Sequence, residues 1–180
     1  MKHLLLARAA NHHKNTLMPH FPSTTRQHSC NLRKGRHSEP GHTYLLTAVT
    51  HERRMIFSEW QLARLLIIEL RAAQNVGLAE SLAWVVMPDH FHWLLTLRSG
   101  GLSSLMKQVK GRSAKSINRA AGNIGKIWQG GFHDHALRHD EDLAAIARYI
   151  IANPLRAGLV ERIGDYPLWD SVWLETGNRG

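Results

Sequence analysis

The chain has 180 residues, of which 43% are hydrophobic and 21% are charged, and this composition is typical of a single globular domain. Apolar runs such as Leu65 to Ile68 are far shorter than the roughly 20 residues that cross a bilayer, and Leu4 to Leu6 is too short for a signal-peptide core. A single cysteine, Cys30, excludes an internal disulfide and a cysteine-based zinc site. We therefore expect a cytoplasmic protein, associated with the nucleoid if its partner is DNA.

Positive charge is concentrated in two blocks of the chain. The 23 Lys and Arg residues exceed the 14 Asp and Glu residues, which gives a net charge of +9. Residues Met1 to Ser38 and Arg98 to His133 each contain 7 basic and no acidic residues, whereas the remaining parts are slightly acidic. A polyanion such as nucleic acid is the natural partner of both blocks, and a solvated basic face is the alternative.

The first block differs from the rest of the chain in its pattern as well as its charge. Residues 1–35 are rich in His, Asn, Arg, Ser and Thr and have no sustained apolar period, which predicts a flexible basic arm. A start at Met18 is an alternative for this segment. We expect a folded domain over residues 36–174 and a short tail over residues 175–180.

Regular patterns begin after Pro40. Thr43 to Thr50 is β-branched and aromatic, which predicts a strand. Ser58 followed by Gln61 fits a capping box that opens a helix ending at Gly77. Leu82 to Met87 and Phe91 to Leu97 are apolar runs separated by a turn-prone Pro-Asp pair, and they predict two neighbouring strands.

A basic amphipathic helix is predicted from Leu102 to about Ala121. Its apolar residues follow one helical stripe, and its basic residues spread over the opposite arc. The basic residues, which we expect to bind DNA phosphates, are Lys107, Lys110, Arg112, Lys115 and Arg119. Gly111 marks a position at which this helix could break.

The last part of the chain predicts one more strand and one more helix. Lys126 to Gly131 has the pattern of a strand or of the lead-in to one, Asp140 is placed to cap the helix, and Asn153-Pro154 ends or kinks it. The order strand, helix, strand, strand, helix, strand, helix predicts an α/β (α+β) sandwich of ferredoxin-like type. We expect a mostly antiparallel sheet with the helices on one face.

Two His-x-His pairs occur, His90 with His92 and His133 with His135. Alternate side chains of a strand share a face, so His90 and His92 project together as half of a divalent-metal site, at the start of a strand too apolar to be exposed. The alternative is a pair of surface or hydrogen-bonded histidines at the start of a strand, since the chain has 13 His in total. The second pair lies beside two glycines, and we rank it below the first.

Tyr149 is a candidate nucleophile on the last helix. It lies off the apolar stripe of that helix, and Asn153 lies one turn further along the same side, where its amide oxygen could complete a metal site. The alternative is a tyrosine whose ring is packed and whose hydroxyl is in water. Packing suffices to explain Tyr44 and Tyr166.

These residues resemble the single-tyrosine HUH transposases, and within them the REP-associated branch. The HUH motif is matched by His90-Phe91-His92 within VVMPDHFHWLL. Three further segments match in the expected order, namely GRHSEPGHTYLLTAVTHERRMIF at Gly35 to Phe57, IWQGGFHDHALRHDEDL at Ile127 to Leu143 and ARYIIANPLRAGLV at Ala147 to Val160.

The resemblance implies a ferredoxin-like nuclease that cleaves and rejoins single-stranded DNA beside a hairpin, as a monomer or a homodimer. It implies that Tyr149 attacks the scissile phosphate to give a 5′-phosphotyrosine and a free 3′-hydroxyl. His90, His92 and Asn153 match the ligands of Mg²⁺ or Mn²⁺. Gly35 to Ser38 is similar to the branch's signature for bases at the hairpin foot, which adds Arg36 to the DNA-binding residues.

Two other functions fit part of the sequence. Rolling-circle replication initiators share the His-x-His pair and the tyrosine but less of the flanking sequence. A domesticated DNA- or RNA-binding module would keep the fold without turnover, and the presence of Tyr149, His90 and His92 argues against it.

Overall fold

The computed structural model describes residues 38–173. The predicted arm over residues 1–35, Arg36 within the branch signature, and the predicted tail over residues 175–180 lie outside the described residues. The domain bounds of 36 and 174 therefore stay a prediction.

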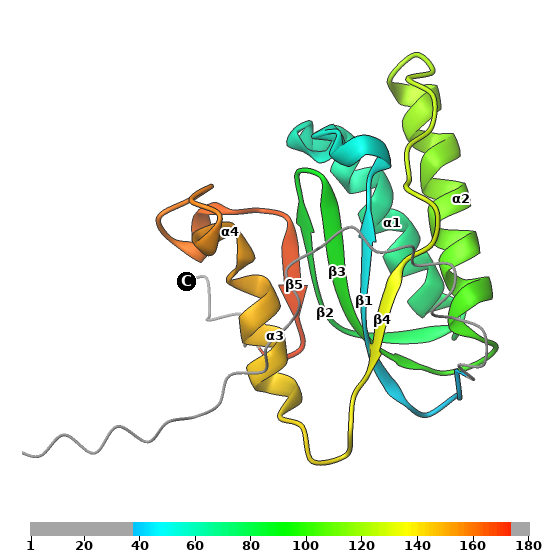
Figure 1. Cartoon of the computed structure of the whole chain (residues 1–180), viewed down its shortest axis with the longest axis vertical. Coiled ribbons are helices and arrows are strands. Elements are labelled where there is room, and N and C mark those ends of the chain that lie inside the picture. Colours follow the sequence, from blue (N-terminus) through cyan, green and yellow to red (C-terminus); the bar gives the residue numbers. More distant parts are fainter. Residues whose placement is uncertain (1–37, 174–180) are drawn as a thin grey trace, which may run out of the picture.

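A five-stranded antiparallel sheet forms the centre of the molecule (Figure 1). Its strands are β1 (Thr43–Val49), β2 (Ala79–Met87), β3 (His90–Leu97), β4 (His133–Ala136) and β5 (Trp169–Ser171). Their order across the sheet is β4-β1-β3-β2-β5, and every neighbouring pair is antiparallel. The first four strands thus have the order 4-1-3-2 of a ferredoxin-like sheet, which confirms the predicted fold class.

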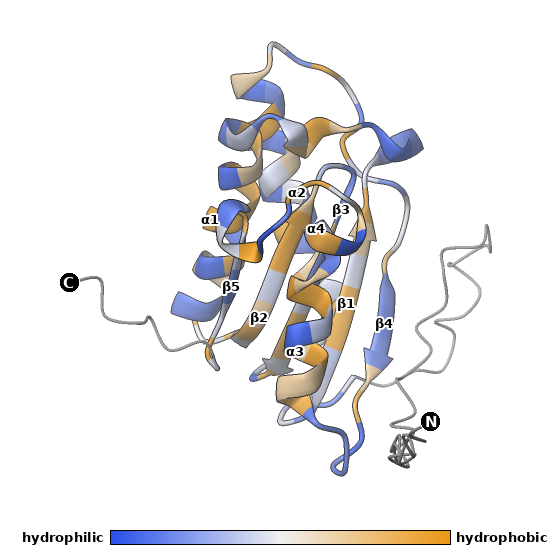
Figure 2. Ribbon diagram, turned by 90° about the vertical axis from the view of Figure 1, so that its left-hand side faces the viewer, coloured by the Kyte–Doolittle hydropathy of each residue, from blue (hydrophilic) through white to orange (hydrophobic). Residues whose placement is uncertain are grey.

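Helices cover both faces of this sheet. On one face lie α1 (Trp60–Asn75) and α2 (Leu102–Ala120), and on the other lies α3 (Leu143–Ile151), followed by α4 (Asn153–Arg156) (Figures 1 and 2). The prediction of helices on one face is therefore right for α1 and α2 and wrong for α3. The reason is that the strands have apolar side chains on both faces, so that both faces need a cover.

Each face of the sheet has its own core. Leu46 and Trp93 point toward α1 and α2, where they pack with Leu66 and Met106. A second, smaller core lies between the sheet and α3. Its central residues are Leu45, Val85 and Leu94 from the sheet and Ile146 and Ile150 from α3.

The structure corrects three local predictions about helix ends and continuity. Ser58 does not cap α1: it ends a 3-10 turn (Ile56–Ser58), in which Phe57 N–H donates to Pro88 O, and Glu59 precedes the helix without a side-chain cap. Asp142, not Asp140, caps α3, because its Oδ1 accepts from Ala145 N–H at 2.9 Å. The α2 helix continues through Gly111 without a break.

Two strands differ from their predicted places. Residues 126–131 contribute an isolated bridge between Thr50 and Trp128, and the fourth strand follows them at His133–Ala136. The short β5 was not predicted, because three residues carry too little periodicity to mark a strand. The kink at Asn153-Pro154 is confirmed, since α3 ends at Ile151 and α4 begins at Asn153.

Candidate active site

The histidine pair of β3 lies on the sheet face that α3 covers. Phe91 and Trp93, which alternate with the histidines, are fully buried in the core beneath α1 and α2. His90 and His92 therefore project together on the opposite face, where their ring centroids lie 5.0 Å apart in an edge-on arrangement. The strand alternation that the sequence predicted has placed both imidazoles at one site.

Each imidazole is held through its Nδ1 atom. His90 Nδ1 lies 2.5 Å from Asp89 Oδ1, and His92 Nδ1 shares a hydrogen bond of 2.8 Å with Thr47 Oγ1 on the neighbouring strand β1. With Nδ1 engaged in both rings, Nε2 is the nitrogen that each ring can offer to a ligand. Partners of this kind fix ring orientation in metal sites.

Asp89 is itself held as a carboxylate. The hydrogen bond from His90 is the main cause that keeps the pKa of Asp89 below its usual value, and Arg53, whose Nη1 lies 2.8 Å from Asp89 Oδ2, adds to it. Burial opposes this shift but does not reverse it. An ionised Asp89 thus accepts from His90 and fixes that ring.

His92 is neutral at physiological pH. Burial lowers the pKa of His92 to about 3, and the charges of His90 and Arg156 contribute to the same shift. A neutral imidazole is the form that donates a lone pair to a metal ion. The environment of His92 therefore favours the ligand form over the imidazolium.

Tyr149 and Asn153 reach this face from α3 and α4. Ile146 and Ile150 fix α3 to the sheet and leave Tyr149 half-buried at the edge of the same core. The kink after Ile151 starts α4 at Asn153. Val85, the strand partner of His92 on β2, packs in one core with Ile146 and Tyr149 of α3. The charge of Arg156 on α4 also contributes to the lowered pKa of His92, so the two helices lie beside the histidine pair.

Arg156 connects the residues of the two helices. Its guanidinium carbon lies 4.0 Å from the centroid of the Tyr149 ring, and its Nη2 donates to Tyr149 O at 2.7 Å and to Asn153 Oδ1. The Nδ2 of Asn153 is buried without a hydrogen-bond partner in the described part of the chain. Arg156 therefore holds the Asn153 amide through its Oδ1 atom, while the Nδ2 atom of the same amide has no partner in the described part of the chain.

These residues could hold a divalent metal ion if a third protein ligand joins the two histidines. No group of three His, Cys, Asp or Glu side chains among residues 38–173 could hold a metal ion, so a third protein ligand near the pair would be of another kind, such as an amide oxygen. Two imidazole Nε2 atoms and an amide oxygen suit a first-row divalent ion. Asn153 could be this ligand if its amide flipped. In the present orientation its Oδ1 accepts a hydrogen bond from Arg156, and its Nδ2 has no partner among the described residues.

The second histidine pair shares the face but not the centre of the site. His133 pairs with Thr47, and Thr47 pairs with His92, so the three residues form one row across β4, β1 and β3. Two strand spacings, about 10 Å, separate the backbones of His133 and His92, and these residues form no group of three His, Cys, Asp or Glu side chains in the described part of the chain that could hold a metal ion. His135 is exposed, and its Nε2 lies 3.6 Å from Glu141 Oε1.

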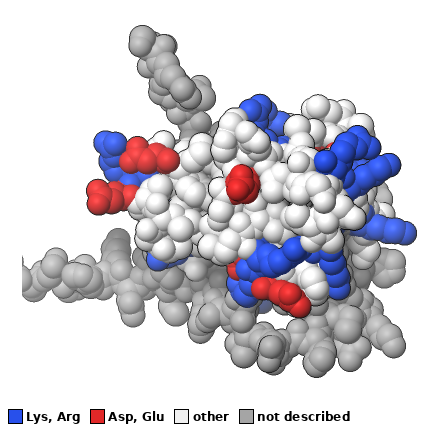
Figure 3. All heavy atoms as spheres, turned by 90° about the horizontal axis from the view of Figure 1, so that it is seen from above, with Lys and Arg blue, Asp and Glu red and all other residues white. Residues whose placement is uncertain are grey.

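The predicted phosphate-binding residues of α2 lie on the other face of the sheet. Lys110 Nζ donates to Gln129 O and Gly131 O, and Arg112 Nε lies 2.9 Å from Glu69 Oε2. The remaining three, Lys107, Lys115 and Arg119, are exposed. Seen from above, Lys and Arg side chains gather on the right, the side on which α2 lies in Figure 1 (Figure 3). The structure thus does not bring this basic face to the histidine pair.

Four residues of the site were not predicted. They are Thr47, Arg53, Asp89 and Arg156. Asp89 directly precedes His90, and Arg156 follows Asn153 by three residues, and these spacings were the available signals. Tyr166 was assigned to packing, and its hydroxyl donates to Val86 O at 2.6 Å.

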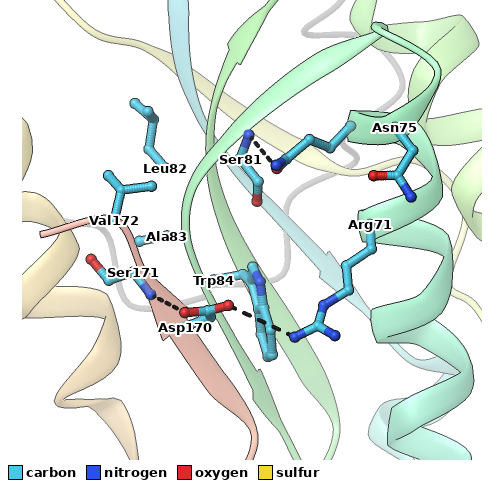
Figure 4. A pocket seen from close by; sticks show the side chains of 10 residues that line it. Arg71, Asn75, Ser81, Leu82, Ala83, Trp84, Asp170, Ser171 and Val172 are labelled. Atoms are coloured by element: carbon cyan, nitrogen blue, oxygen red, sulfur yellow. Dashed lines mark hydrogen bonds and ion pairs between the residues drawn. The ribbon is translucent and has the colours of Figure 1, made fainter. Parts of the chain in front are cut away.

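A pocket of about 370 Å³ lies between α1, β2 and β5 (Figure 4). Its polar residues largely satisfy one another: Arg71 Nη2 lies 3.9 Å from Asp170 Oδ2, and Gln74 Oε1 accepts from Ser81 N–H. On β2 it uses residues 81–84, whereas His90 pairs with Met87 at the end of that strand. The pocket therefore belongs to a different part of the sheet from the histidine pair.

None of the helices within residues 38–173 combines the length and the apolar character that a membrane span requires.

Comparisons with known proteins agree on one family. The family model described as "Transposase IS200 like" matches residues 38–153, a span that contains His90, His92, Tyr149 and Asn153. A REP-associated tyrosine transposase of Escherichia coli strain K12 is 32% identical over 131 residues, which cover 71% of this chain and 74% of the relative. A putative REP-associated tyrosine transposase of Haemophilus influenzae is 32% identical over 99 residues, which cover 49% of this chain and 56% of the relative.

A solved structure agrees with these relatives. It is a REP-associated tyrosine transposase bound to a REP hairpin, and it superposes with a TM-score of 0.59 at 30% identity. The match covers 74% of this chain and 79% of the solved chain.

Proposed function

The chain belongs to the IS200-like transposase family, and from this membership we propose that it cleaves and rejoins single-stranded DNA beside a hairpin, with Tyr149 as the nucleophile. The observation that carries the proposal is the convergence of Tyr149, Asn153 and Arg156 with the histidine pair of β3 on one face of the sheet. The partner is single-stranded DNA with a palindromic hairpin, which is supported by the relative bound to a REP hairpin. Such a protein acts at the nucleoid, in the cytoplasm.

The cleavage step exchanges one phosphodiester for another. The hydroxyl oxygen of Tyr149 attacks the scissile phosphorus, a bond forms between that oxygen and phosphorus, and the bond to the 3′-oxygen breaks. The tyrosine loses its proton, and the departing 3′-oxygen gains one. The product is a 5′-phosphotyrosine and a free 3′-hydroxyl, and the reverse attack by a 3′-hydroxyl rejoins DNA without a high-energy cofactor.

We propose that His90, His92 and Asn153 hold a divalent metal ion, Mg²⁺ or Mn²⁺. When bound, such an ion withdraws charge from the phosphate oxygens and stabilises the transition state. Asp89 and Thr47 orient the two imidazoles toward it, and burial keeps His92 in its neutral form. Asn153 joins the set when its amide turns away from Arg156.

DNA contacts outside the centre are assigned by charge. Lys107, Lys115 and Arg119 are exposed cations of α2 and would bind phosphates without regard to sequence. Lys110 and Arg112 contribute less, since each already has protein partners. Arg36 in the Gly35–Ser38 signature would contact bases at the hairpin foot. The active unit is a monomer or a homodimer.

The test is a covalent adduct between the protein and a single-stranded oligonucleotide that carries a REP-type hairpin, with Mn²⁺ added. We expect the wild type to give a slowly migrating, protease-sensitive species. Y149F should abolish this species and keep the dissociation constant of the oligonucleotide, because only the nucleophilic oxygen is lost. Y166F is the matched control: its tyrosine lies outside the site and should leave the adduct unchanged.

An adduct that survives in Y149F would contradict the choice of nucleophile. Binding without any adduct across several hairpin sequences would favour the binding module. A replication initiator would instead support replication of a plasmid that carries its origin.

A further inference from the structure

Arg156 lies between the two halves of the candidate site. Its guanidinium stacks on the Tyr149 ring at 4.0 Å, donates to Tyr149 O and Asn153 Oδ1, and contributes its charge to the environment of His92. It lies beyond residue 153, where the family match ends. The same side chain thus touches the proposed nucleophile and a proposed ligand.

The guanidinium of Arg156 has N–H groups that donate to no described residue. Both of its hydrogen bonds leave from Nη2, and neither Nη1 nor Nε has a partner in the described part of the chain. The guanidinium is exposed and forms no ion pair with a described carboxylate. Six other exposed arginines of residues 38–173 do form such pairs, namely Arg53, Arg71, Arg98, Arg112, Arg148 and Arg162. Exposed Arg64, Arg119 and Arg138 have no described carboxylate partner either, but among these unpaired arginines it is Arg156 that stacks on Tyr149.

An unpaired cation beside the nucleophile suits an anion that arrives with the substrate. In the proposed cleavage the phosphate must lie between the Tyr149 hydroxyl and the histidine pair, which is the region that Arg156 borders. Negative charge spreads over the non-bridging oxygens of the phosphate as the bond to tyrosine forms. The planar fork of a guanidinium matches two such oxygens, which an ammonium group cannot do.

We propose that Arg156 binds the scissile phosphate through Nη1 and Nε while its Nη2 keeps its bond to Tyr149 O across the kink between α3 and α4. This inference rests on the proposed function and adds a catalytic residue to it. A purely structural Arg156 is the competing explanation, because the Nη2 bonds alone could hold the kink between α3 and α4. The two explanations differ in whether the effect of Arg156 depends on the charge of the phosphate.

The experiment therefore varies that charge. The phosphate cleaved by the wild type is mapped first, and a second oligonucleotide is made with a neutral methylphosphonate at that position. Single-turnover rates of adduct formation are then measured for both oligonucleotides at saturating DNA and Mn²⁺. R148Q is the matched control, since Arg148 is an exposed cation next to Tyr149 that pairs with Asp142 instead.

We expect R156Q to slow the reaction of the normal oligonucleotide by about 100-fold or more, as the loss of one preorganised donor to developing charge does in other enzymes. On the methylphosphonate, R156Q should differ from the wild type by less than about tenfold, because the charge that Arg156 recognises is gone. R156K should lie between the two on the normal oligonucleotide, since it keeps the charge without the fork. R148Q should match the wild type on both.

Three results would overturn the proposal. Equal losses in R156Q on both oligonucleotides, together with a changed Mn²⁺ affinity of the free protein, would show that Arg156 acts through Asn153. A wild-type rate in R156Q would exclude any role in the reaction. A wild type that gives no adduct would contradict the proposed function and this inference with it. In the other two outcomes the wild type still forms the adduct, so only the inference fails.

Discussion

At the scale of single residues, the site contains two imidazole rings whose orientation is fixed by neighbouring side chains. The Nδ1 atoms of His90 and His92 are each occupied by an oxygen from a neighbouring side chain, Asp89 in one case and Thr47 in the other. Arg53 in turn holds Asp89. These neighbouring side chains decide which nitrogen each imidazole presents, so their loss should weaken the proposed metal binding even though no proposed ligand has changed.

The Thr47 hydroxyl offers a direct test of these neighbouring side chains. T47V keeps the shape of the side chain and removes the partner of His92 Nδ1, so the affinity for Mn²⁺ should fall about 10-fold to 100-fold. Mn²⁺ titration followed by electron paramagnetic resonance measures this affinity.

T43V is the matched control for T47V. Thr43 lies on the same strand and the same face, but its hydroxyl bonds to Thr96 at 3.0 Å, away from the histidines. Equal Mn²⁺ affinities in the two variants would show that Thr47 does not orient His92.

Residue types and spacing predicted part of this site and missed the rest. The period of a strand is enough to bring His90 and His92 together. A kink separates Tyr149 on α3 from Asn153 on α4, and the two are connected through Arg156. Thr47 reaches His92 across 45 positions in the chain and Asp89 meets Arg53 across 36, and such contacts follow from strand pairing that no local pattern encodes. Arg156 was missed because its spacing of three residues from Asn153 is a weak signal beside a predicted helix end.

At the scale of elements, the position of α3 decides whether the site exists. Tyr149, the proposed nucleophile, is carried by a helix of nine residues, which is too short to be stable alone and depends on its packing against the sheet. Ile146 and Ile150 provide that packing against the core formed with Leu94 and Val85. The sequence pattern predicted the apolar stripe of α3 but not the face that it covers, because a stripe does not say which side of a two-sided sheet it meets.

Truncation of the α3 stripe should therefore cost stability and activity together. Ile150 is 1% exposed, so I150A should lower the free energy of unfolding by about 2–5 kcal/mol. Urea denaturation followed by circular dichroism measures this change. The adduct should form more slowly, because α3 no longer holds Tyr149 against the sheet.

I68A on α1 is the control for the same substitution at the surface. Ile68 is 56% exposed, and its truncation should change the unfolding free energy by no more than about 0.5 kcal/mol. Similar losses in I150A and I68A would mean that α3 is not packed as described.

At the scale of the whole molecule, chemistry and charge lie on opposite faces of the sheet. The histidine pair and Tyr149 share the α3 face, whereas Lys107, Lys115 and Arg119 extend from α2 on the other. DNA that contacts both must pass around the edge of the sheet. The charge pattern of the sequence predicted a basic helix correctly, but its position relative to the site depends on the crossover connections of the fold.

Removal of these three cations should weaken DNA binding more than it slows adduct formation. In the triple variant K107Q/K115Q/R119Q, the slope of log affinity against log salt should become shallower by about 2, at roughly 0.7 for each single-strand phosphate that is no longer neutralised. The rate of adduct formation at saturating DNA should not change. Fluorescence anisotropy over a range of NaCl concentrations gives the slope.

A second triple variant, which also removes three positive charges, distinguishes binding by α2 from an effect of net charge. R71Q/R98Q/R162Q removes three arginines that already pair with Asp170, Glu80 and Asp165. A salt slope reduced as much in this control as in the α2 variant would show that α2 has no special part in binding.

The central claim is that Tyr149 becomes covalently joined to DNA, and peptide mapping of the adduct tests it most directly. Trypsin cleavage after Arg148 and Arg156 releases residues 149–156, which contain one tyrosine. We predict that mass spectrometry of the nuclease-trimmed adduct finds this peptide heavier by a nucleotide attached through its 5′-phosphate. An unmodified 149–156 peptide, with the nucleotide on another residue or absent, would contradict this claim.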